Sequence, residues 1–343
     1  MESIALFAVP VFFVLSGYLI GGILLNTRNR EGFFRVFYSR RVIRIFPVFY
    51  LALLIIACLD AAFRFPLRFQ FWSQFLYIQN LLPEFHAYST PVVVIQYWSL
   101  ATEEQFYLLW PLAVWFFPKK QKLLGVASFL VLICFVIRLA GHYLFASPFQ
   151  IRYSSLTRAD AILLGVILGL VYKESFFTRI KAYAKWLALV GVVSLAFWSF
   201  WRDLSWPESF RGQQLAIPLT NFTAVALIIY LLEENNWLSR ICSFRWIGWM
   251  GRMSYSLYIV HYAYAHWIWY VVIPHLARHM PHILAVLLSN ALAFSLTLLL
   301  AVLSYRFIET PCQKLKQRLK YGAVNDTGDS PELRSPVLAE TTS

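Results

Sequence analysis

Long apolar runs separated by short polar connections make up most of the sequence. The first run, Ile4–Leu25, has 22 residues, enough to cross about 30 Å of hydrocarbon at about 1.5 Å per residue. Eight further runs follow at Phe46–Phe63, Trp98–Phe117, Leu123–Phe145, Ala159–Tyr172, Trp186–Trp201, Gln214–Leu232, Met253–Ile273 and Ile283–Ser304. The pattern predicts an all-α, polytopic membrane helix bundle with nine spans.

Composition supports this prediction. Hydrophobic residues make up 59% of the 343 residues and charged residues only 14%, whereas globular proteins have about 25% charged residues. The net charge of +13 is typical of nucleic-acid binders, but the basic residues gather in the connections between apolar runs. We therefore exclude nucleic-acid binding. The four cysteines are scattered without the spacing of a metal site, and no metal is expected.

Lysine and arginine are unevenly divided between the two sets of alternating connections. One set holds 21 of them and the other holds 7. Because cytoplasmic loops carry the excess of basic residues, the first connection is predicted to be cytoplasmic, with the N-terminus outside and the C-terminus inside. Residues 1–320 form the predicted membrane domain. Residues 321–343 are polar and predict a disordered cytoplasmic tail.

Two short features within the apolar pattern predict packing. Gly17 and Gly21 form a small-residue pair that favours close helix contact. Ser16 lies beside them, and packing is the use we expect of it; lining a cavity and bonding its own backbone are the alternatives. The aromatic segment 71–80 precedes the third run and is expected to lie at the outer interface, where it would cover a polar site.

Two adjacent carboxylates, Glu103 and Glu104, lie inside the third run. A charge near the centre of a membrane helix costs about 2.5–3.5 kcal/mol and usually faces a protein interior. Neighbouring residues point about 100° apart on a helix, whereas Glu103 and Tyr107 share a face. One glutamate is therefore predicted to line a site. A solvated helix start at the outer interface is the alternative.

Further polar residues are predicted near the same outer leaflet. They are Asp60, Arg138, Arg158 and Asp160. Together with the glutamates they predict an outward-facing polar cavity. As the alternative, Arg158 and Asp160 are interfacial anchors and Arg138 extends its side chain toward the headgroups.

The inner side carries a basic pair and a histidine. Arg41 and Arg44, three residues apart, share a helix face and are suited to a phosphate-bearing ligand. Ordinary positive-inside topology explains them equally. His261 lies about 12 Å into its run, where a lone histidine usually bonds a neighbouring helix.

Six segments together make the chain resemble the type-three acyltransferase family of integral membrane proteins. The segment of residues 98–111, Trp-Ser-Leu-Ala-Thr-Glu-Glu-Gln-Phe-Tyr-Leu-Leu-Trp-Pro, is the specific one. The others are Phe-Phe-Val-Leu-Ser-Gly-Tyr-Leu-Ile (12–20), Arg-Arg-Val-Ile-Arg-Ile-Phe-Pro (40–47), Thr-Arg-Ala-Asp (157–160), Ser-Tyr-Ser-Leu-Tyr-Ile-Val-His (254–261) and Tyr-Arg-Phe-Ile-Glu (305–309).

The resemblance implies O-acyl transfer, usually of acetyl, from cytoplasmic acetyl-CoA or another acyl-CoA to an extracytoplasmic carbohydrate or glycolipid, including surface polysaccharide and lipopolysaccharide. It implies a bacterial inner membrane location, with membrane lipid around the protein. Arg41 and Arg44 would bind the donor. The implied catalytic residues are Glu103, Tyr107, Arg158, Asp160 and His261.

One departure from the family pattern affects what is expected of the chain. Members begin with a further helix that carries an arginine and, some ten residues later, a histidine considered to be the base. We therefore expect the reading frame to continue upstream of Met1, or the product to be a truncated, inactive acyltransferase. A membrane transporter or scaffold, in which the buried charges serve ion pairing or substrate passage, is the alternative class.

Overall fold

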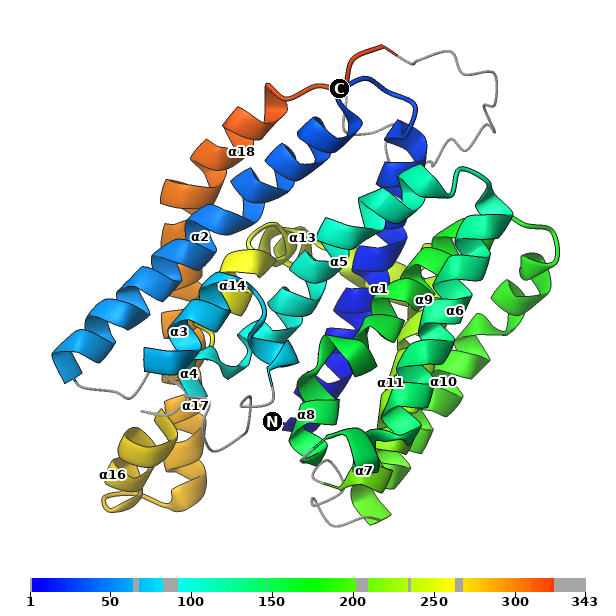
Figure 1. The fold of residues 1–343 in the computed structure, drawn as a ribbon. Coiled ribbons are helices and arrows are strands. Elements are labelled where there is room, and N and C mark those ends of the chain that lie inside the picture. Colours follow the sequence, from blue (N-terminus) through cyan, green and yellow to red (C-terminus); the bar gives the residue numbers. More distant parts are fainter. Residues whose placement is uncertain are drawn as a thin grey trace.

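The computed structural model describes residues 2–63, 68–82, 92–145, 147–201, 209–233, 236–262 and 268–323, and in these ranges it contains helices and no strand. The predicted all-α class is therefore confirmed. Figure 1 shows the long helices running side by side, with the N-terminus and the C-terminal end of α18 at opposite ends of the bundle. Of the predicted disordered tail, residues 324–343 lie outside the described ranges.

The long helices are α1 (Glu2–Thr27), α2 (Phe33–Phe63), α5 (Tyr97–Phe116), α6 (Lys120–Leu139), α9 (Ser155–Val171), α10 (Phe177–Trp201), α11 (Phe210–Leu232) and α17 (His282–Ser304). Shorter helices connect or extend them: α3 (Arg68–Phe75), η1 (Gln79–Leu81), α4 (Val92–Ile95), α7 (Gly141–Leu144), α8 (Pro148–Tyr153), α12 (Trp237–Cys242), α13 (Arg245–Arg252), α14 (Ser254–Val260), η3 (Ile268–Val272), α16 (Ile273–Ala277), η4 (Tyr305–Glu309) and α18 (Thr310–Gln317).

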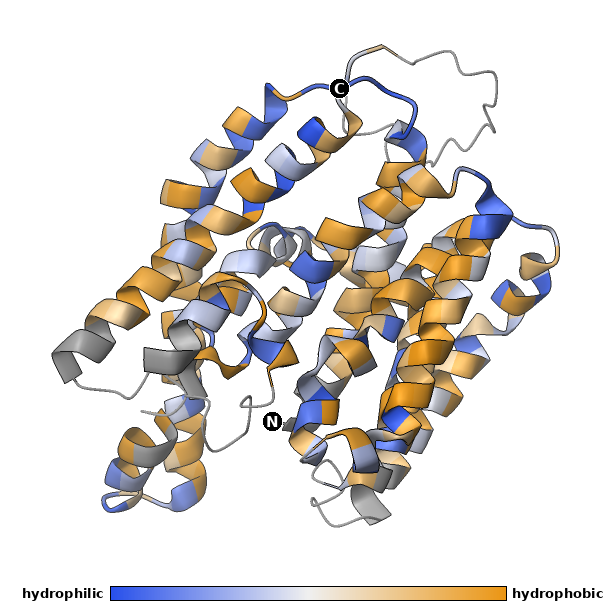
Figure 2. Cartoon of the chain, in the orientation of Figure 1, coloured by the Kyte–Doolittle hydropathy of each residue, from blue (hydrophilic) through white to orange (hydrophobic). Residues whose placement is uncertain are grey.

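Seven helices in the described ranges are long and apolar enough to cross a membrane: Phe7–Thr27, Phe33–Cys58, Lys120–Leu139, Pro148–Val171, Phe177–Phe197, Gly212–Leu232 and His282–Gln317. Large apolar side chains on them point outward. Leu54 is 58% exposed, Phe129 61% and Leu287 62%. Figure 2 shows hydrophobic residues along most of the helices, with hydrophilic residues in the connections and within parts of α2 and α5; the long apolar stretches are expected of a surface that faces lipid rather than water.

Two of the nine predicted spans do not meet these criteria. The run Trp98–Phe117 forms α5, which is 20 residues long but is not among the seven, because its glutamates and aromatic residues lower its hydropathy. The run Met253–Ile273 is not one helix. There α14 covers only Ser254–Val260, and a π-helical turn, η3, follows after residues outside the described ranges.

The second span begins earlier than predicted. Helix α2 starts at Phe33 and includes the basic stretch with Arg35, Arg40, Arg41 and Arg44. Arginine favours helices about as well as leucine does, so hydropathy alone does not mark where this helix begins. The basic pair therefore lies on a membrane-length helix rather than in a connection.

The helices form two sides that meet at α5 (Figure 1). On one side α1 packs against α9 and α11, α9 against α6, and α10 against α11. On the other side α18 and α14 pack against α2, and α17 packs against α14 and α16. Helix α5 contacts α1 and α9, and η1 contacts both α5 and α9.

Glycine makes the contact between α1 and α9 very close. A Cβ atom at Gly17 would lie 1.9 Å from the carbonyl oxygen of Ile162, and one at Gly165 would lie 2.0 Å from that of Val14. Gly21 is less critical, since its Cβ would meet Val166 at 3.6 Å. The predicted packing role of Gly17 is thus confirmed, and it is accompanied by a glycine of α9.

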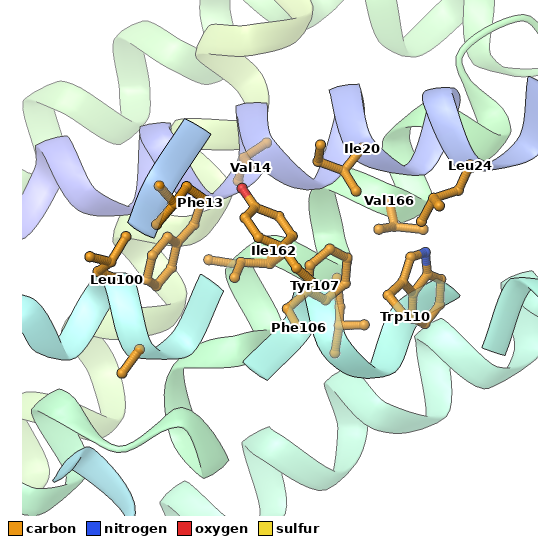
Figure 3. Packing of buried hydrophobic residues seen from close by; sticks show 14 of the residues in the cluster. Phe13, Val14, Ile20, Leu24, Leu100, Phe106, Tyr107, Trp110, Ile162 and Val166 are labelled. Atoms are coloured by element: carbon orange, nitrogen blue, oxygen red, sulfur yellow. The ribbon is translucent and has the colours of Figure 1, made fainter. Parts of the chain in front are cut away.

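The core around this contact is aromatic and aliphatic. Figure 3 shows Tyr107 and Trp110 of α5 beside Ile20 and Leu24 of α1 and Val166 of α9. All five side chains are buried. Lipid is as apolar as these side chains, so it is their close packing, rather than removal from water, that holds α5 in the bundle despite its two glutamates.

The segment of α3 and η1 packs on the polar side of α5. Asn80 is buried, and its side-chain amide donates to the Thr102 hydroxyl at 3.0 Å and to the Ser155 hydroxyl at 2.7 Å. Gln79 donates to the carbonyl of Tyr97 at 3.0 Å. The aromatic segment predicted to cover a polar site therefore joins α5 to α9.

At the basic end of the bundle, which carries Arg28, Arg40 and Lys316, the chain after α18 is attached to its beginning. Arg40 donates to the carbonyl of Leu319 and lies over the ring of Tyr321. The backbones of residues 322 and 323 bond to Glu31 at 3.1 Å each. The first residues of the predicted tail are thus ordered against the start of α2.

Candidate active site

Three side chains form a hydrogen-bonded chain where α5 meets α1. The hydroxyl groups of Ser16 and Tyr107 are 2.6 Å apart. Tyr107 also donates to Oε1 of Glu103 at 3.3 Å. All three residues are buried. The prediction that Glu103 and Tyr107 share a face is confirmed. The Ser16 hydroxyl bonds to Tyr107 and not to its own backbone.

Arg41 of α2 brings a positive charge to this cluster. Its guanidinium carbon lies 4.9 Å from the centre of the Tyr107 ring and 5.6 Å from that of Phe37. Its charge interacts with both Glu103 and Glu104, yet no ion pair joins Arg41 to either glutamate in the described residues. A cation this close to a tyrosine face gains about 1–2 kcal/mol when desolvated.

The second arginine of the predicted pair lies in a different environment. Arg44 is exposed. It interacts electrostatically with Glu103 and, on α18, with Lys316. The prediction kept Arg41 and Arg44 together at the inner mouth and apart from the glutamates. The structure brings Arg41 to the Tyr107 ring, and Arg44, although exposed, also interacts electrostatically with Arg41 and Glu103.

Glu104 lies three residues before Tyr107, but in the described residues it makes no hydrogen bond to Ser16, Tyr107 or Glu103. Its Oε1 atom is buried and has no hydrogen-bond partner. The nearest charge interactions are with Glu103 and Arg41. The two neighbouring carboxylates therefore differ: one ends a hydrogen-bonded chain, and the other has a free acceptor oxygen.

Asp160 and Arg138 form a separate buried pair between α6 and α9. Their side chains make a direct ion pair and are 6% and 1% exposed. Arg138 also donates to the carbonyl of Thr157 at 2.6 Å, and Asp160 accepts from the backbone N–H of Ala161 at 2.9 Å. Neither behaves as an interfacial anchor. Arg138 does not extend to the headgroups, because Asp160 neutralises it inside the bundle.

Arg158, the other predicted residue of this motif, lies toward α5. Its guanidinium is 5.5 Å from the centre of the Trp98 ring, the side chain is 2% exposed, and its Nε atom has no partner. The motif at residues 157–160 thus divides between two contacts. Asp160 pairs with Arg138 of α6, and Arg158 lies over the Trp98 ring at the start of α5.

His261 is exposed at the end of α14, where its Nδ1 atom lies 2.6 Å from the carbonyl of Tyr258. No hydrogen bond in the described residues links it to Glu103. The polar residues before it hold α14 in place: Tyr258 bonds to Ser99, Tyr255 donates to the carbonyl of Ile45 at 2.7 Å, and Ser256 donates to Glu309. Asp60 belongs to α2, but its side chain lies outside the described residues.

The sequence indicated Glu103 and Tyr107 but missed Ser16 as their partner. Its only signal was its place beside Gly17, the residue that lets α1 approach α9 and sets the position of α1. In the described residues, no group of three or more histidine, cysteine, aspartate or glutamate side chains is placed to hold a metal ion.

Comparison with known proteins agrees with the resemblance in the sequence. A family model described as an acyltransferase domain matches residues 1–306. Peptidoglycan O-acetyltransferase OatA of Listeria monocytogenes is 29% identical over 327 residues, which cover 89% of this chain and 51% of that protein. The putative peptidoglycan O-acetyltransferase YrhL of Bacillus subtilis is 29% identical, with 88% and 50% covered. O-acetyltransferase OatA of Staphylococcus aureus is 24% identical.

No solved structure matches. The chain spans about half the length of the curated relatives it matches. The seven apolar helices and the relatives identify an integral membrane protein. The family model covers most of the sequence and includes every segment of the resemblance up to Arg306, so the chain belongs to the acyltransferase domain family.

Proposed function

We propose that this chain is a membrane O-acyltransferase that moves an acetyl group from acetyl-CoA to a hydroxyl of an extracytoplasmic glycan of the peptidoglycan type. The names of the relatives support the acetyl group and the acceptor class. The observation that carries the proposal is the buried chain Ser16, Tyr107 and Glu103 with Arg41 against the tyrosine ring. It combines a proton acceptor, two hydroxyl donors and an unpaired cation in one place.

The reaction needs these groups. The acceptor hydroxyl oxygen bonds to the thioester carbonyl carbon, the carbon–sulfur bond breaks, and the hydroxyl proton passes to a base and then to the departing CoA thiolate. Glu103 is suited to receive the proton through Tyr107. Arg41 and the Ser16 hydroxyl are suited to stabilise the negative charge that develops on the carbonyl oxygen.

The donor is proposed to enter from the basic end of the bundle. Arg40, Arg41 and Arg44 of α2 and Lys316 of α18 interact electrostatically there. CoA carries several phosphate groups, for which arginine forks are the preferred ligands in proteins. The excess of basic residues at this end also supports a cytoplasmic orientation, with the C-terminus inside. The glycan would then reach the start of α5 from the opposite side.

Membrane vesicles supplied with radiolabelled acetyl-CoA and an oligomer of N-acetylglucosamine test this function. Transfer of label to the oligomer, lost in Glu103→Gln vesicles with equal protein content, is the expected result. Movement of the oligomer across the vesicle membrane without labelling would instead indicate a transporter. Absence of both would leave no support for either activity.

A further inference from the structure

The short helices α12 and α13 have much of their surface uncovered. Residues 241–248 form an unbroken run of exposed residues. The main contacts of α12 and α13 are with each other and with their neighbours in the chain, α11 and α14. A Cβ atom at Gly248 or at Gly251 would meet nothing within 4 Å. The rest of the described chain therefore leaves this segment available for contact with another molecule.

Large apolar side chains account for most of the exposed surface. They are Trp237 (60% exposed), Ile241 (38%), Phe244 (62%), Trp246 (76%), Ile247 (40%) and Met250 (36%). In α13 the apolar residues lie on one side, because positions 246, 247, 249 and 250 project within about 160° of one another on a helix. Contiguous apolar surface that is exposed in this way marks a contact with a partner or with a membrane.

The opposite side of α13 is basic. Arg245 and Arg252 are the first and last residues of the helix, and both are exposed. Neither makes an ion pair or a side-chain hydrogen bond in the described residues. Arg240 of α12 is exposed as well, and residues 237–252 contain no aspartate or glutamate. The segment thus combines three uncompensated positive charges with an apolar side.

The segment lies at the basic end of the bundle and runs across it. It follows the end of α11, where the Tyr172 hydroxyl donates to the carbonyl of Leu232 at 3.2 Å. It precedes α14, whose Tyr255 bonds to Ile45, the residue after Arg44. Figure 1 views α13 almost along its axis and the long helices from the side. If the long helices span a membrane, α13 lies in the plane of that membrane.

These features fit an anionic lipid surface. An interfacial helix places its apolar side at the boundary between headgroups and acyl chains, where tryptophan is favoured, and its basic residues among the headgroups. Each basic residue near an anionic surface strengthens binding about fivefold. A twofold contact between two copies of the chain fits less well, because it would bring the same arginines together with no acidic residue from this segment.

We propose that residues 237–252 form a lipid-binding surface for anionic phospholipid headgroups of the leaflet at the basic end of the bundle. The aromatic side enters the headgroup boundary, and Arg240, Arg245 and Arg252 bond phosphate oxygens. This surface is separate from the Glu103 cluster. Its binding of lipid does not depend on acyl transfer, so the proposed function and the lipid surface are tested independently.

The test uses Cys242, an exposed thiol within the segment, to attach an environment-sensitive fluorophore. Cys58 and Cys312 are replaced by serine, and Cys134 is buried. The full chain is placed in nanodiscs of phosphatidylcholine alone or of phosphatidylcholine mixed with phosphatidylglycerol. Quenching by a lipid that is spin-labelled near its headgroup then gives the ratio of docked to undocked segment.

We expect stronger quenching with phosphatidylglycerol than without it. The double variant Arg245→Gln with Arg252→Gln should lower the docked ratio about 25-fold in the anionic mixture, and it should leave the ratio in phosphatidylcholine unchanged. Lys119→Gln with Lys122→Gln is the matched control, since it removes two exposed charges from another connection, beside Arg28. The control should stay within about twofold of the parent protein.

Equal quenching in the two lipid mixtures, or equal ratios in the arginine variant and the control, would overturn the proposal. Absence of quenching together with a dimer in light scattering would also overturn it and would assign the surface to a second copy of the chain. Thermal unfolding shows which variants are folded. Added salt tests the parent protein without any arginine substitution: the phosphatidylglycerol-dependent part of the quenching should fall as the charges are screened, and a salt-independent signal would overturn the proposal.

Discussion

Two groups of buried charges in this bundle contrast in how their charges are paired. Between α6 and α9, Arg138 and Asp160 make a direct ion pair and bond the adjacent backbone. Between α1, α2 and α5, Arg41 stacks on Tyr107 and approaches two glutamates without an ion pair to either in the described residues. Both groups contain charges of opposite sign, but only Arg138 and Asp160 make a direct ion pair in the described residues.

The difference separates structural charges from reactive ones. A buried pair repays its desolvation only when its partners bond well, and removing one partner is then costly for folding. Charges held near each other but unpaired can still bond a substrate and stabilise new charge, which preorganised catalytic groups need. We therefore expect stability to depend on the Arg138 group and transfer to depend on the Glu103 group.

The largest expected effect is on transfer in Glu103→Gln. The amide keeps the size of the carboxylate and can still accept from Tyr107, but it cannot take up a proton, so the rate should fall about 10²–10⁴-fold. Radiolabel transfer in vesicles measures this. Thermal unfolding in detergent should stay close to wild type. If Glu103→Gln also unfolds at a much lower temperature than wild type, the loss of transfer would reflect a structural role of Glu103 instead.

Asp160→Ala should give the opposite result. It leaves Arg138 buried without its partner, which costs about 3–5 kcal/mol of folding free energy. Thermal unfolding and the yield of monodisperse protein measure the loss. The double variant Arg138→Met with Asp160→Leu should recover much of it, because both charges are gone. If Asp160→Ala remains stable yet inactive, Asp160 takes part in the reaction, as the resemblance implied.

A smaller effect is expected from Arg41→Ala. Losing a charge-assisted bond to the donor costs about 1.5–3 kcal/mol, so the KM for acetyl-CoA should rise about 10- to 100-fold. Arg44→Ala removes the second arginine of the proposed donor entrance, and the smaller increase in KM is expected there because this side chain is exposed. Equal effects in both variants would contradict the special position of Arg41 at the Tyr107 ring.

The smallest effect is expected from Ser16→Ala. It removes one hydrogen bond to Tyr107 and should lower the transfer rate about two- to tenfold. Ser289→Ala controls for the substitution itself, since Ser289 is a buried serine of α17 whose hydroxyl has no partner. If Ser16→Ala transfers at the wild-type rate, the hydrogen-bonded chain begins at Tyr107.

The fold class and the burial of Glu103 follow from the sequence, because the length of the apolar runs and the carboxylates inside one of them are both visible in it. The partners of the charged residues do not. Arg138 and Asp160 are 22 positions apart, and helix–helix packing brings them together. Arg41 lies five residues before the predicted second span, and the earlier start of α2 places it on the helix that brings it to Tyr107.

The predicted span Met253–Ile273 shows that apolar content alone does not predict where a helix ends, since α14 covers only Ser254–Val260. Its apolar content is sufficient, but the polar face of α14 bonds to Ile45, Ser99 and Glu309. These tertiary bonds fix a short helix inside the bundle. Apolar content alone does not reveal them.

The close approach of Gly17 to Ile162 and of Gly165 to Val14 has a mechanical consequence. With backbone against backbone and no room for a methyl group, α1 and α9 cannot slide past each other without collision. The two helices are therefore expected to move together as one rigid pair, with Ser16 on α1 and Arg158 on α9. The side of α2 and α14 is joined instead by side-chain hydrogen bonds such as that from Tyr255 to the carbonyl of Ile45, so we expect an opening for the proposed donor and glycan to form on that side.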